Sequence, residues 1–421
     1  MTVIGIDDTD SREHGMCTTY VAAMLAGRIE RAGGRVERVL LVRLNPAVEH
    51  KTRGNAALAI HCDLTVDRAL ELGTEALDRA KTGDDRTNPG LVVASCDPDA
   101  VPAAVASFAE QAVRSHLDRA SARGKCAEAG FETSTRGNGR GLIGALAAVG
   151  AWQAFGEWTY EHIAYRERER WGTGRTVDRD SVFAAAEAWY PAVWDTVDRE
   201  EGTAVCVPRT PCPVLYGIRG DDPEAVKRVG ADIASEPVAD SQLFVTNQGT
   251  DAHLQDGTLG TLRDGHAYRV TGEVVEPPDT REGGHVFLTL SDGTQTLPVA
   301  AFEPTKRFRD RVRALRDGDR ITACGEVSDG TLKLEKFAVR DLVGTEQVTP
   351  DCSDCGRSME SAGRNAGYRC RGCGTSAAGK VERSVERDLE SGWYEVPPCA
   401  RRHIAKPLVR SGFDGPTHPE R

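Results

Sequence analysis

The sequence predicts a multidomain protein of the α+β class, and three observations support this prediction. The chain has 421 residues, which at about 150 residues per domain corresponds to two to four domains. Strand and helix patterns alternate over the first part of the chain, a period of two begins at Tyr268, and two Cys-x-x-Cys pairs follow. We therefore expect an N-terminal α/β domain, a second α+β region, a β-barrel and a cysteine ribbon, in that order.

Composition argues against two broad classes of protein. Hydrophobic residues make up 39% of the chain and charged residues 28%, so wholesale disorder is not expected. No apolar run approaches the roughly 20 residues that span a bilayer, and the N-terminus lacks the basic and apolar regions of a signal peptide. We expect a cytoplasmic protein with no membrane association.

The charge balance is acidic, with a formal charge of −11 and nine lysines among 53 basic residues. An acidic, lysine-poor surface is typical of proteins that stay soluble in strong salt. In strong salt, counterion release contributes less to nucleic-acid binding. The negative charge therefore does not exclude a nucleic acid as partner.

Strands and helices alternate over residues 1–125. Strands are predicted at residues 3–6, 36–44, 57–62 and 91–95, and helices at 18–32, 65–81 and 99–123. Thr65 is expected to cap the second helix. We end this α/β domain at residue 125, because Gly124, Lys125 and Gly130 interrupt the helical pattern.

The second region, residues 126–255, mixes helices and strands. The glycine-rich segment 136–144 leads into a helix that we expect to end near Phe155. Further secondary structure is predicted at residues 158–166, 180–194 and 214–219, and the region ends near His253.

Residues 265–345 predict an OB-fold barrel. Five strands are expected at residues 270–275, 286–290, 296–301, 320–327 and 332–339, and a helix at 308–315 between the third and fourth. A small β-sandwich is the alternative, but the position of the helix favours the OB fold. OB folds bind single-stranded or loop nucleic acid. The tail after Gly412 is expected to be frayed.

The two cysteine pairs predict a zinc ribbon over residues 350–400. The pairs are Cys352/Cys355 and Cys370/Cys373, and 14 residues separate them. This spacing allows four thiolates to surround one Zn²⁺. A disulfide or a redox pair is the alternative, and the reducing compartment argues against the first. Three flanking glycines are expected to adopt positive φ angles in the knuckle turns: Gly356, Gly372 and Gly374.

Three carboxylates follow the first strand: Asp7, Asp8 and Asp10. Carboxylate oxygens there suit Mg²⁺, which normally accompanies the phosphates of a nucleotide. The helix that begins near Thr18 and Thr19 offers a phosphate-binding N-terminus. Lys51 and Arg53 suit charge neutralisation in phosphoryl transfer. A solvated turn followed by an unrelated basic loop explains the spacing equally well, and no Walker A motif is present.

The glycine-rich loop contains Arg136, Asn138 and Arg140 before a helix. No clean strand precedes it, so a dinucleotide-binding loop is not indicated. An anion or nucleotide site and close backbone packing are equally good explanations. His50, His61 and His116 have no partner at metal-ligand spacing and are expected to be structural or surface residues.

Taken in order, these motifs resemble the archaeal agmatidine synthases, which are tRNA 2-agmatinylcytidine synthetases that act on the isoleucine tRNA with a CAU anticodon. The resemblance covers essentially the whole chain. The motifs are GIDDTDS, GMCTTY, KTRGNAAL, TNPG, RGNGRGLIGALAAVGAW, PVLYGIRGD and FVTNQGTDAHL, followed by the barrel and the ribbon. The acidic composition fits a haloarchaeal member.

The resemblance implies an enzyme, an ATP-dependent carbon–nitrogen ligase. Its first domain is kinase-like and activates the C2 oxygen of the wobble cytidine, while ATP is cleaved to AMP and phosphate. Its second domain is ferredoxin-like and helps to bind agmatine, whose amine displaces the activated oxygen. The barrel and the ribbon hold the tRNA, and the product allows AUA codons to be read.

The resemblance also implies roles for individual residues. Thr18 matches the autophosphorylated threonine of the family, with Thr19 adjacent. The acidic motif and Lys51 would bind ATP and Mg²⁺, and Lys51 and Arg53 would stabilise the transferred phosphoryl group. Apart from the resemblance, a guanidinium should meet a carboxylate, and the candidates in the second region are Glu161, Asp221 and Asp222, among which the spacing does not select. Arg136, Asn138 and Arg140 complete the expected substrate-binding set.

Two other functions remain open at this stage. The barrel and ribbon could belong to a non-enzymatic protein that binds single-stranded nucleic acid, although binding alone needs neither the acidic cluster nor the KTRGN loop. The chain could also be an ATP-dependent ligase of small amines with no RNA substrate, which would leave the barrel and the ribbon without a purpose.

Overall fold

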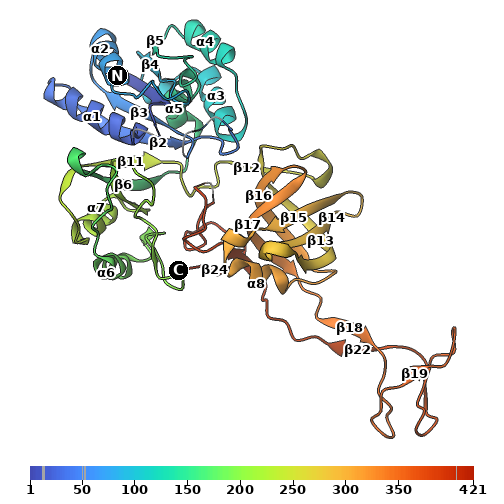
Figure 1. The fold of residues 1–421 in the computed structure, drawn as a ribbon. Helices are drawn as coiled ribbons and strands as arrows, with labels where there is room; N and C mark the ends of the chain where they lie inside the picture. The colour runs from blue at the N-terminus through green and yellow to red at the C-terminus, as the bar shows by residue number, and fades with distance from the viewer. Residues whose placement is uncertain (12–14, 50, 52–53, 404) are drawn as a thin grey trace.

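The computed structural model describes residues 1–11, 15–49, 51, 54–403 and 405–421 of the chain. Two α/β units lie side by side, a barrel packs beside them, and a narrow ribbon projects from the barrel (Figure 1). No helix within these residues is long and apolar enough to cross a membrane.

The first unit is a split βαβ arrangement. Its elements are β1 (Thr2–Asp7), α1 (Thr18–Arg31), β2 (Val36–Arg43), β3 (Ala56–Cys62), α2 (Val66–Leu77) and β4 (Gly90–Ala94). The strand order is β4-β1-β3-β2, with every neighbouring pair antiparallel. The two βαβ units interleave, with β3 between β1 and β2, and β1 between β3 and β4. Neighbouring strands therefore run antiparallel although strands and helices alternate along the chain. The predicted strands and helices are confirmed here, although Thr65 makes no side-chain capping bond.

Helices cover both faces of this sheet. On one face α1 and α2 pack against Ile4, Leu58 and their neighbours. On the other lie α3 (Ala103–Arg114), α4 (Arg119–Glu128) and α5 (Leu142–Ala154). The helix α5 approaches so closely that a Cβ on Gly5 would lie 2.1 Å from the carbonyl oxygen of Ala145.

The single helix predicted at 99–123 is wrong, because the chain forms α3 and α4 with a break between them. Ser115 has an extended backbone, and the Asp118 side chain accepts a hydrogen bond from the Ser121 N–H and starts the new helix. Gly124 and Lys125 lie inside α4, and Gly130 follows it with a positive φ.

A domain boundary at residue 125 would therefore cut a helix. Beyond it, β5 (Glu132–Thr135) pairs with β4, and α5 packs against β1, β3 and β4. We propose that the first domain extends to Ala154.

The second unit repeats the same topology. Its main elements are β6 (Thr159–Arg166), α6 (Arg179–Trp189), β7 (Val193–Trp194), β10 (Val214–Gly220), α7 (Pro223–Asp232) and β11 (Val238–Thr246). The order β11-β6-β10-β7 is again that of a ferredoxin-like split βαβ sheet. A short parallel contact between β2 and β11 joins the two units into one nine-stranded sheet. The hairpin of β8 (Val197–Asp198) and β9 (Thr203–Ala204) lies off this sheet.

The predicted OB barrel is confirmed. Its strands are β13 (Ala267–Thr280), β14 (Val286–Ser291), β15 (Thr296–Ala301), β16 (Arg320–Ser328) and β17 (Thr331–Asp341), with α8 (Phe308–Arg313) between the third and fourth. Pairing of β16 with both β13 and β17 closes the barrel. Three further strands extend its sheet: β12 (Leu254–Asp256), β23 (Gly392–Glu395) and β24 (Thr417–His418). Short 3₁₀ turns occur at Pro98–Ala100, Arg168–Arg170, Leu259–Thr261, Glu282–Gly284 and Glu303–Thr305.

The ribbon lies at the end of a two-stranded stalk, β18 (Thr345–Val348) and β22 (Val381–Ser384) (Figure 1). Three short strands form the ribbon itself: β19 (Glu360–Ser361), β20 (Tyr368–Arg369) and β21 (Ser376–Ala377).

The prediction that the C-terminal tail is frayed is wrong. The strand β24 pairs with β23, and the ring of His418 stacks on Tyr394 at 4.4 Å. Glu420 pairs with Arg307 at 2.6 Å, and the carbonyl oxygen of Arg421 accepts from the Arg199 N–H at 3.1 Å. These contacts hold the tail between the second unit and the barrel.

Candidate active site

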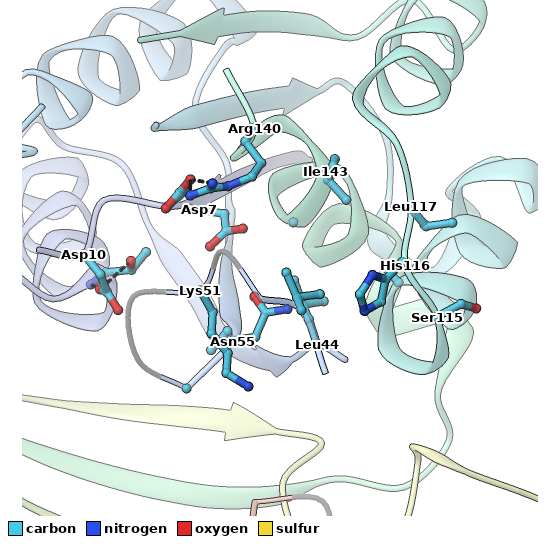
Figure 2. A pocket seen from close by; sticks show the side chains of 17 residues that line it. Asp7, Asp10, Leu44, Lys51, Asn55, Ser115, His116, Leu117, Arg140 and Ile143 are labelled. Atoms are coloured by element: carbon cyan, nitrogen blue, oxygen red, sulfur yellow. Dashed lines mark hydrogen bonds and ion pairs between the residues drawn. The ribbon is translucent and has the colours of Figure 1, made fainter. Parts of the chain in front are cut away.

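A cavity of about 180 Å³ opens at the carboxyl end of β1 (Figure 2). It lies in the first unit, between the end of the sheet, the start of α5 and the break between α3 and α4. The residues that line it are Asp7, Asp8, Asp10, Thr18, Leu44, Val48, Lys51, Gly54, Asn55, Ala56, Ala112, Ser115, His116, Leu117, Arg140, Ile143 and Gly144.

Asp7 is the last residue of β1 and lies beneath the start of α5. A Cβ on Gly144 would lie 2.0 Å from Asp7 Oδ2, so only glycine at this position leaves room for the carboxylate. Burial raises the pKa of Asp7 well above its usual value, and the neighbouring charge of Asp8 raises it further. A cation placed beside Asp7 would favour its ionised form and lower this pKa.

Asp8 faces Arg140 of the glycine-rich loop. The Nε and Nη2 atoms of Arg140 both donate to Asp8 Oδ2, at 3.1 and 2.8 Å. Burial raises the pKa of Asp8 to about 7, although Arg140 acts in the opposite direction. Asp8 also has a φ of 58°, a conformation that turns its side chain away from the line of the strand.

Asp10 holds the start of α1. Its Oδ1 accepts hydrogen bonds from the Thr18 N–H and from the Thr18 hydroxyl, the latter at 2.8 Å. Cys17, at the N-cap position, makes no capping bond of its own, so Asp10 takes that role from an earlier position in the chain. The Thr18 hydroxyl thus lies at the cavity wall, bonded to a carboxylate. Thr19 is absent from this wall but lines a neighbouring cavity with Cys17, whose Sγ it contacts at 3.1 Å.

Lys51 also lines the cavity, and its ammonium group donates to the carbonyl oxygen of Pro46. Arg53, the second predicted cation of this loop, lies outside the described residues, as does His50.

The sequence did not predict the wall of this cavity that lies opposite the carboxylates. Ser115, His116 and Leu117 reach it because α3 ends at Arg114, and Ile143 reaches it from the first turn of α5. Asp118, an N-capping residue type after His116, was the available signal that the helix breaks here.

A second cavity of about 260 Å³ lies between the two units. It shares Asp10, Thr18, Gly54 and Ala56 with the first cavity. Its far wall comes from the second unit and carries Ile163, Val205, Cys206, Pro208, Val214, Gly217, Arg219 and Glu161. The Asp10–Thr18 pair therefore borders both cavities.

Glu161, on β6, is the buried carboxylate of this second cavity. Its Oε2 accepts from Arg43 Nη2 at 3.3 Å and its Oε1 from Arg219 Nε at 3.2 Å. Arg43 also lines a third, basic cavity with Lys51, Arg401, Arg402 and His403, where the C-terminal segment meets the first unit. Sequence reasoning selected Glu161 but neither of its arginines.

The other predicted substrate residues lie elsewhere. Asp222 caps α7 through the N–H groups of Glu224 and Ala225, and Asp221 pairs with Arg410 at 2.7 Å. Arg136 pairs with Asp78 at 2.7 Å on the surface. The Asn138 side chain accepts from the Arg140 N–H and fixes the loop. Of the predicted residues of the glycine-rich loop, Arg140 alone lines a described cavity.

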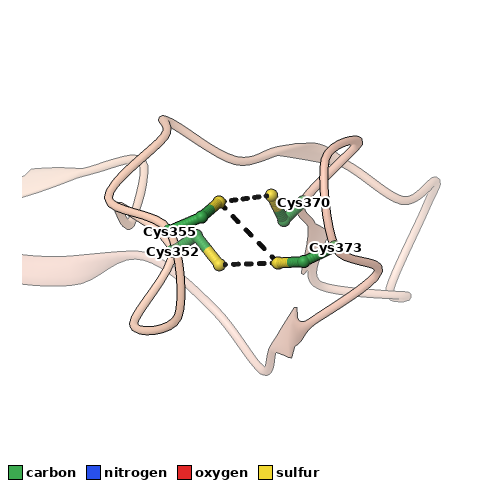
Figure 3. Close-up of side chains that lie close together, drawn as sticks. All are labelled: Cys352, Cys355, Cys370 and Cys373. Atoms are coloured by element: carbon green, nitrogen blue, oxygen red, sulfur yellow. Dashed lines mark hydrogen bonds between the residues drawn. The ribbon is translucent and has the colours of Figure 1, made fainter.

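The four ribbon cysteines form a ligand cage (Figure 3). Their sulfur atoms all lie within 4.8 Å of one another, and three of the separations are 3.2, 3.5 and 3.7 Å. A tetrahedron of sulfur atoms about 2.3 Å from zinc has edges of about 3.8 Å, so the set fits the ion. Within the part of the chain that the structure describes, this is the one group of three or more candidate ligands. Asp7, Asp8 and Asp10 do not form such a group.

The two cysteine knuckles have the same backbone geometry. The N–H of Gly356 donates to the Cys352 carbonyl at 2.8 Å, and the N–H of Gly374 donates to the Cys370 carbonyl at 2.9 Å. Both glycines have positive φ, as predicted. Gly372 does not, and the prediction for it is wrong. Its N–H instead donates to Cys370 Sγ at 3.3 Å.

Comparisons with known proteins agree with this arrangement. Models of the TiaS TCKD domain, the TiaS FLD domain, an OB-fold nucleic acid binding domain and the TiaS C-terminal zinc ribbon domain match residues 3–68, 139–253, 268–335 and 349–389. The isoleucine-tRNA 2-agmatinylcytidine synthetase TiaS of Haloquadratum walsbyi is 54% identical, with 100% of both chains covered.

The chain belongs to the TiaS family.

Other TiaS proteins are similar over nearly the whole chain. That of Methanosarcina acetivorans is 45% identical over 97% of both chains. A crystal structure of TiaS in complex with its isoleucine tRNA and ATP superposes with a TM-score of 0.90 at 41% identity, covering 100% of this chain and 99% of that one. A complex of TiaS with the same tRNA, AMPCPP and agmatine superposes with a TM-score of 0.87 at 38% identity, with the same coverage.

Proposed function

We propose that this chain, as a TiaS-family enzyme, uses ATP to attach agmatine to the wobble cytidine of the isoleucine tRNA with a CAU anticodon. The observation that carries the proposal is the shared wall of the two cavities. A carboxylate-rich cavity and an amphipathic cavity meet at Asp10 and Thr18, so a nucleotide in one and an amine in the other can reach a common point. Solved relatives hold an isoleucine tRNA with ATP, and the same tRNA with AMPCPP and agmatine.

The first cavity is the proposed ATP site. Leu44, Leu117 and Ile143 offer apolar surface to a base, and Lys51 offers a cation for the phosphates. Asp7 and Asp8 are the proposed ligands of Mg²⁺. Burial raises the pKa of both carboxyl groups, and a divalent cation held by them would favour their ionised forms. Such an ion would supply charge neutralisation to the phosphates when bound.

The chemistry follows from the poor leaving group at C2 of cytosine. The C2 oxygen forms a bond to a phosphorus atom of ATP, and the bond from that phosphorus to its leaving phosphate oxygen breaks. The agmatine amine then forms the C2–N bond, the C2–O bond breaks, and the oxygen leaves as phosphate. Release of AMP breaks both phosphoanhydride bonds of ATP, so two phosphoryl groups are transferred. One goes to the C2 oxygen and the other to the hydroxyl oxygen of Thr18, the proposed autophosphorylation site, from which water releases it as phosphate. Asp10, which accepts the Thr18 hydroxyl proton in a hydrogen bond, is the proposed base.

The second cavity is the proposed agmatine site. Ile163, Val205 and Pro208 offer an apolar surface to the tetramethylene chain, and Glu161 offers a carboxylate to the guanidinium. With the guanidinium at Glu161, the free amine points toward Asp10 and Thr18. The positions of Asp221 and Asp222, a surface ion pair and a helix cap, favour Glu161 over both.

The barrel and the ribbon are the proposed tRNA-binding parts, and Zn²⁺ is the proposed occupant of the four-cysteine site. A base that is extruded from the anticodon loop could then enter the active site while the rest of the tRNA is held elsewhere. Because the substrate is a tRNA, we propose the cytoplasm as the location.

The experiment that tests this function is incubation of the chain with ATP, Mg²⁺, radiolabelled agmatine and an unmodified CAU-anticodon isoleucine tRNA transcript in high-salt buffer. We expect label in the tRNA and release of AMP, and no label in a transcript whose wobble cytidine is replaced by uridine. Agmatine-dependent ATP cleavage without RNA would favour a small-amine ligase. Tight tRNA binding with no ATP cleavage at any salt concentration would favour a binding protein. Either result would overturn the proposal.

A further inference from the structure

Several arginine side chains in this protein donate two hydrogen bonds, one from Nε and one from Nη2, to a single carboxylate. The Nε and Nη2 atoms of Arg166 donate to the two oxygens of Glu236, at 2.6 and 3.1 Å. The same two atoms of Arg140 reach Asp8, and those of Arg136 reach Asp78 at 3.0 and 2.7 Å. Arg166 thus forms two parallel hydrogen bonds to two oxygens, the strong form of the arginine–carboxylate pair, while Arg140 and Arg136 each give both nitrogens to one oxygen.

Arg43 departs from this pattern. Its Nε donates to Gln248 Oε1 at 2.9 Å, and only its Nη2 reaches Glu161, at 3.3 Å. Arg219 likewise gives Glu161 a single nitrogen, Nε, at 3.2 Å. Among the residues that the structure describes, each oxygen of Glu161 therefore receives one long hydrogen bond from an arginine side chain. Because a carboxylate offers about four acceptor positions, each oxygen of Glu161 keeps one for another donor.

Hydrogen bonds fix the position of Gln248, whose side chain accepts from Arg43 Nε in place of Glu161. The parallel pairing of β2 with β11 ends at Thr246. Asn247 then continues it with its side chain, which accepts from the Arg43 N–H at 2.7 Å and donates to the Arg43 carbonyl at 3.1 Å. The main chain of Gln248 is bonded to Thr246 Oγ1 and Thr159 Oγ1, and the residue is 2% exposed.

We propose that Gln248 is a positioning residue that sets the specificity for agmatine, by diverting Arg43 Nε so that Glu161 keeps an open edge for the substrate guanidinium. Without this acceptor, the Arg43 fork is free to turn and give both nitrogens to Glu161, as Arg166 does to Glu236. The free acceptor positions of the Glu161 carboxylate would then be occupied, and a ligand could not bind to them. This inference rests on the proposed function, because it takes Glu161 as the agmatine carboxylate.

The test compares agmatine with butylamine, which has the same four-carbon chain and amine but no guanidinium. In Gln248→Met, which removes the acceptor at similar volume, we expect the KM for agmatine to rise roughly 10-fold or more, as for loss of a hydrogen bond to a charged group. The KM for ATP and the kinetics with butylamine should stay within about twofold of wild type, since neither uses the Glu161 edge.

Two variants distinguish positioning from a general structural effect. Gln248→Glu keeps an acceptor oxygen for Arg43 Nε and should restore the preference for agmatine over butylamine to within about threefold of wild type. Gln242→Met changes the same residue type within the preceding strand β11, where the side chain donates to the Leu243 carbonyl, and should behave as wild type.

An unchanged agmatine preference in Gln248→Met would overturn the inference, as would an equal rise in the KM for ATP and for agmatine. Equal impairment of Gln248→Glu and Gln248→Met would also overturn it. Failure of the proposed function would look different, because the wild-type chain itself would then transfer no agmatine to the tRNA.

Discussion

At the scale of single residues, the two arginines of the glycine-rich loop make the same contact with opposite consequences. Arg140 holds the buried Asp8 inside the first cavity, whereas Arg136 holds Asp78, whose side chain is 60% exposed. Removing the partner of a buried carboxylate strongly destabilises the folded protein, whereas removing the partner of an exposed carboxylate has little effect on stability.

We therefore expect Arg140→Leu to lose at least about 100-fold in ATP cleavage, as when a preorganised charge is removed from an active site. The matched variant Arg136→Leu should stay within about threefold of wild type. Steady-state ATP cleavage with saturating tRNA and agmatine measures both. Equal losses in the two variants would contradict the assignment of Arg140 to the site.

Glu395, on β23, is a second residue whose environment gives a prediction. Burial raises its pKa from 4.5 to about 7, against the opposing effects of the Arg401 charge and of hydrogen bonds from the Glu420 and Leu408 N–H groups, and the charge of Asp195 raises the pKa further. A carboxyl group with a raised folded-state pKa stabilises the fold fully below its unfolded pKa. That stabilisation is lost as the pH rises through the folded pKa.

Between about pH 4.5 and pH 7, the free energy of unfolding should therefore fall by up to about 3 kcal/mol because of Glu395. Glu395→Gln cannot titrate and should show a shallower fall over this range. Urea unfolding at a series of pH values measures the difference. Parallel curves for the two proteins would show that Glu395 does not titrate in this window.

At the scale of elements, α5 determines the shape of the first cavity through its glycines. A Cβ on Gly144 would collide with the Asp7 carboxylate at 2.0 Å, whereas a Cβ on Gly124, within α4, would meet nothing within 4 Å. The two glycines thus lie in helices of the same unit with opposite surroundings.

Gly144→Ala should destabilise the protein by about 1 to 3 kcal/mol through overpacking, and should also lower ATP cleavage because Asp7 must move. Gly124→Ala should stabilise it by about 0.5 to 1 kcal/mol, since alanine favours a helix more than glycine does. Urea unfolding in high salt, with ATP cleavage measured in parallel, separates the two effects. A Gly144→Ala variant with wild-type stability and turnover would contradict the close packing of α5 on Asp7.

The sequence predicted most of these elements, because periodicity and glycine positions act locally. The five barrel strands, the helix between them and the cysteine knuckles followed from patterns within a few residues of each other. The break between α3 and α4 did not, because a long amphipathic pattern runs through it. The ordered C-terminal tail was missed because its partners, Tyr394 and Arg307, are distant in sequence.

The candidate site was predictable to the same extent. The acidic motif, Thr18 and Glu161 were selected from the sequence and line the two cavities, because each is a reactive group in or beside a recognisable segment. Arg43, Arg219 and Gln248 were not, because their role arises only where β2, β11, β6 and β10 lie in this order in the shared sheet, with Gln248 just after β11.

At the scale of the whole molecule, the ribbon lies apart from both cavities, at the end of its stalk (Figure 1). Its cysteines should therefore affect tRNA binding without changing the ATP site.

Cys355→Ser should abolish tight zinc binding and reduce tRNA modification at limiting tRNA by at least about 10-fold, because structural zinc sites supply the folding energy of such ribbons. The KM for ATP should stay within about twofold of wild type. Metal content by atomic absorption and steady-state kinetics measure both. An equal loss of ATP affinity would show that the ribbon acts on the catalytic units.

At this scale, the proposed function divides the reaction between the two cavities on either side of Asp10 and Thr18: ATP is cleaved in the first, and agmatine is bound in the second. The most direct test measures ATP cleavage and agmatine incorporation side by side in Glu161→Gln, with tRNA present. The arrangement predicts that ATP cleavage stays within about threefold of wild type while incorporation falls at least about 100-fold, because a buried carboxylate that pairs with a guanidinium is lost. An equal fall in both activities, or no fall in incorporation, would contradict it.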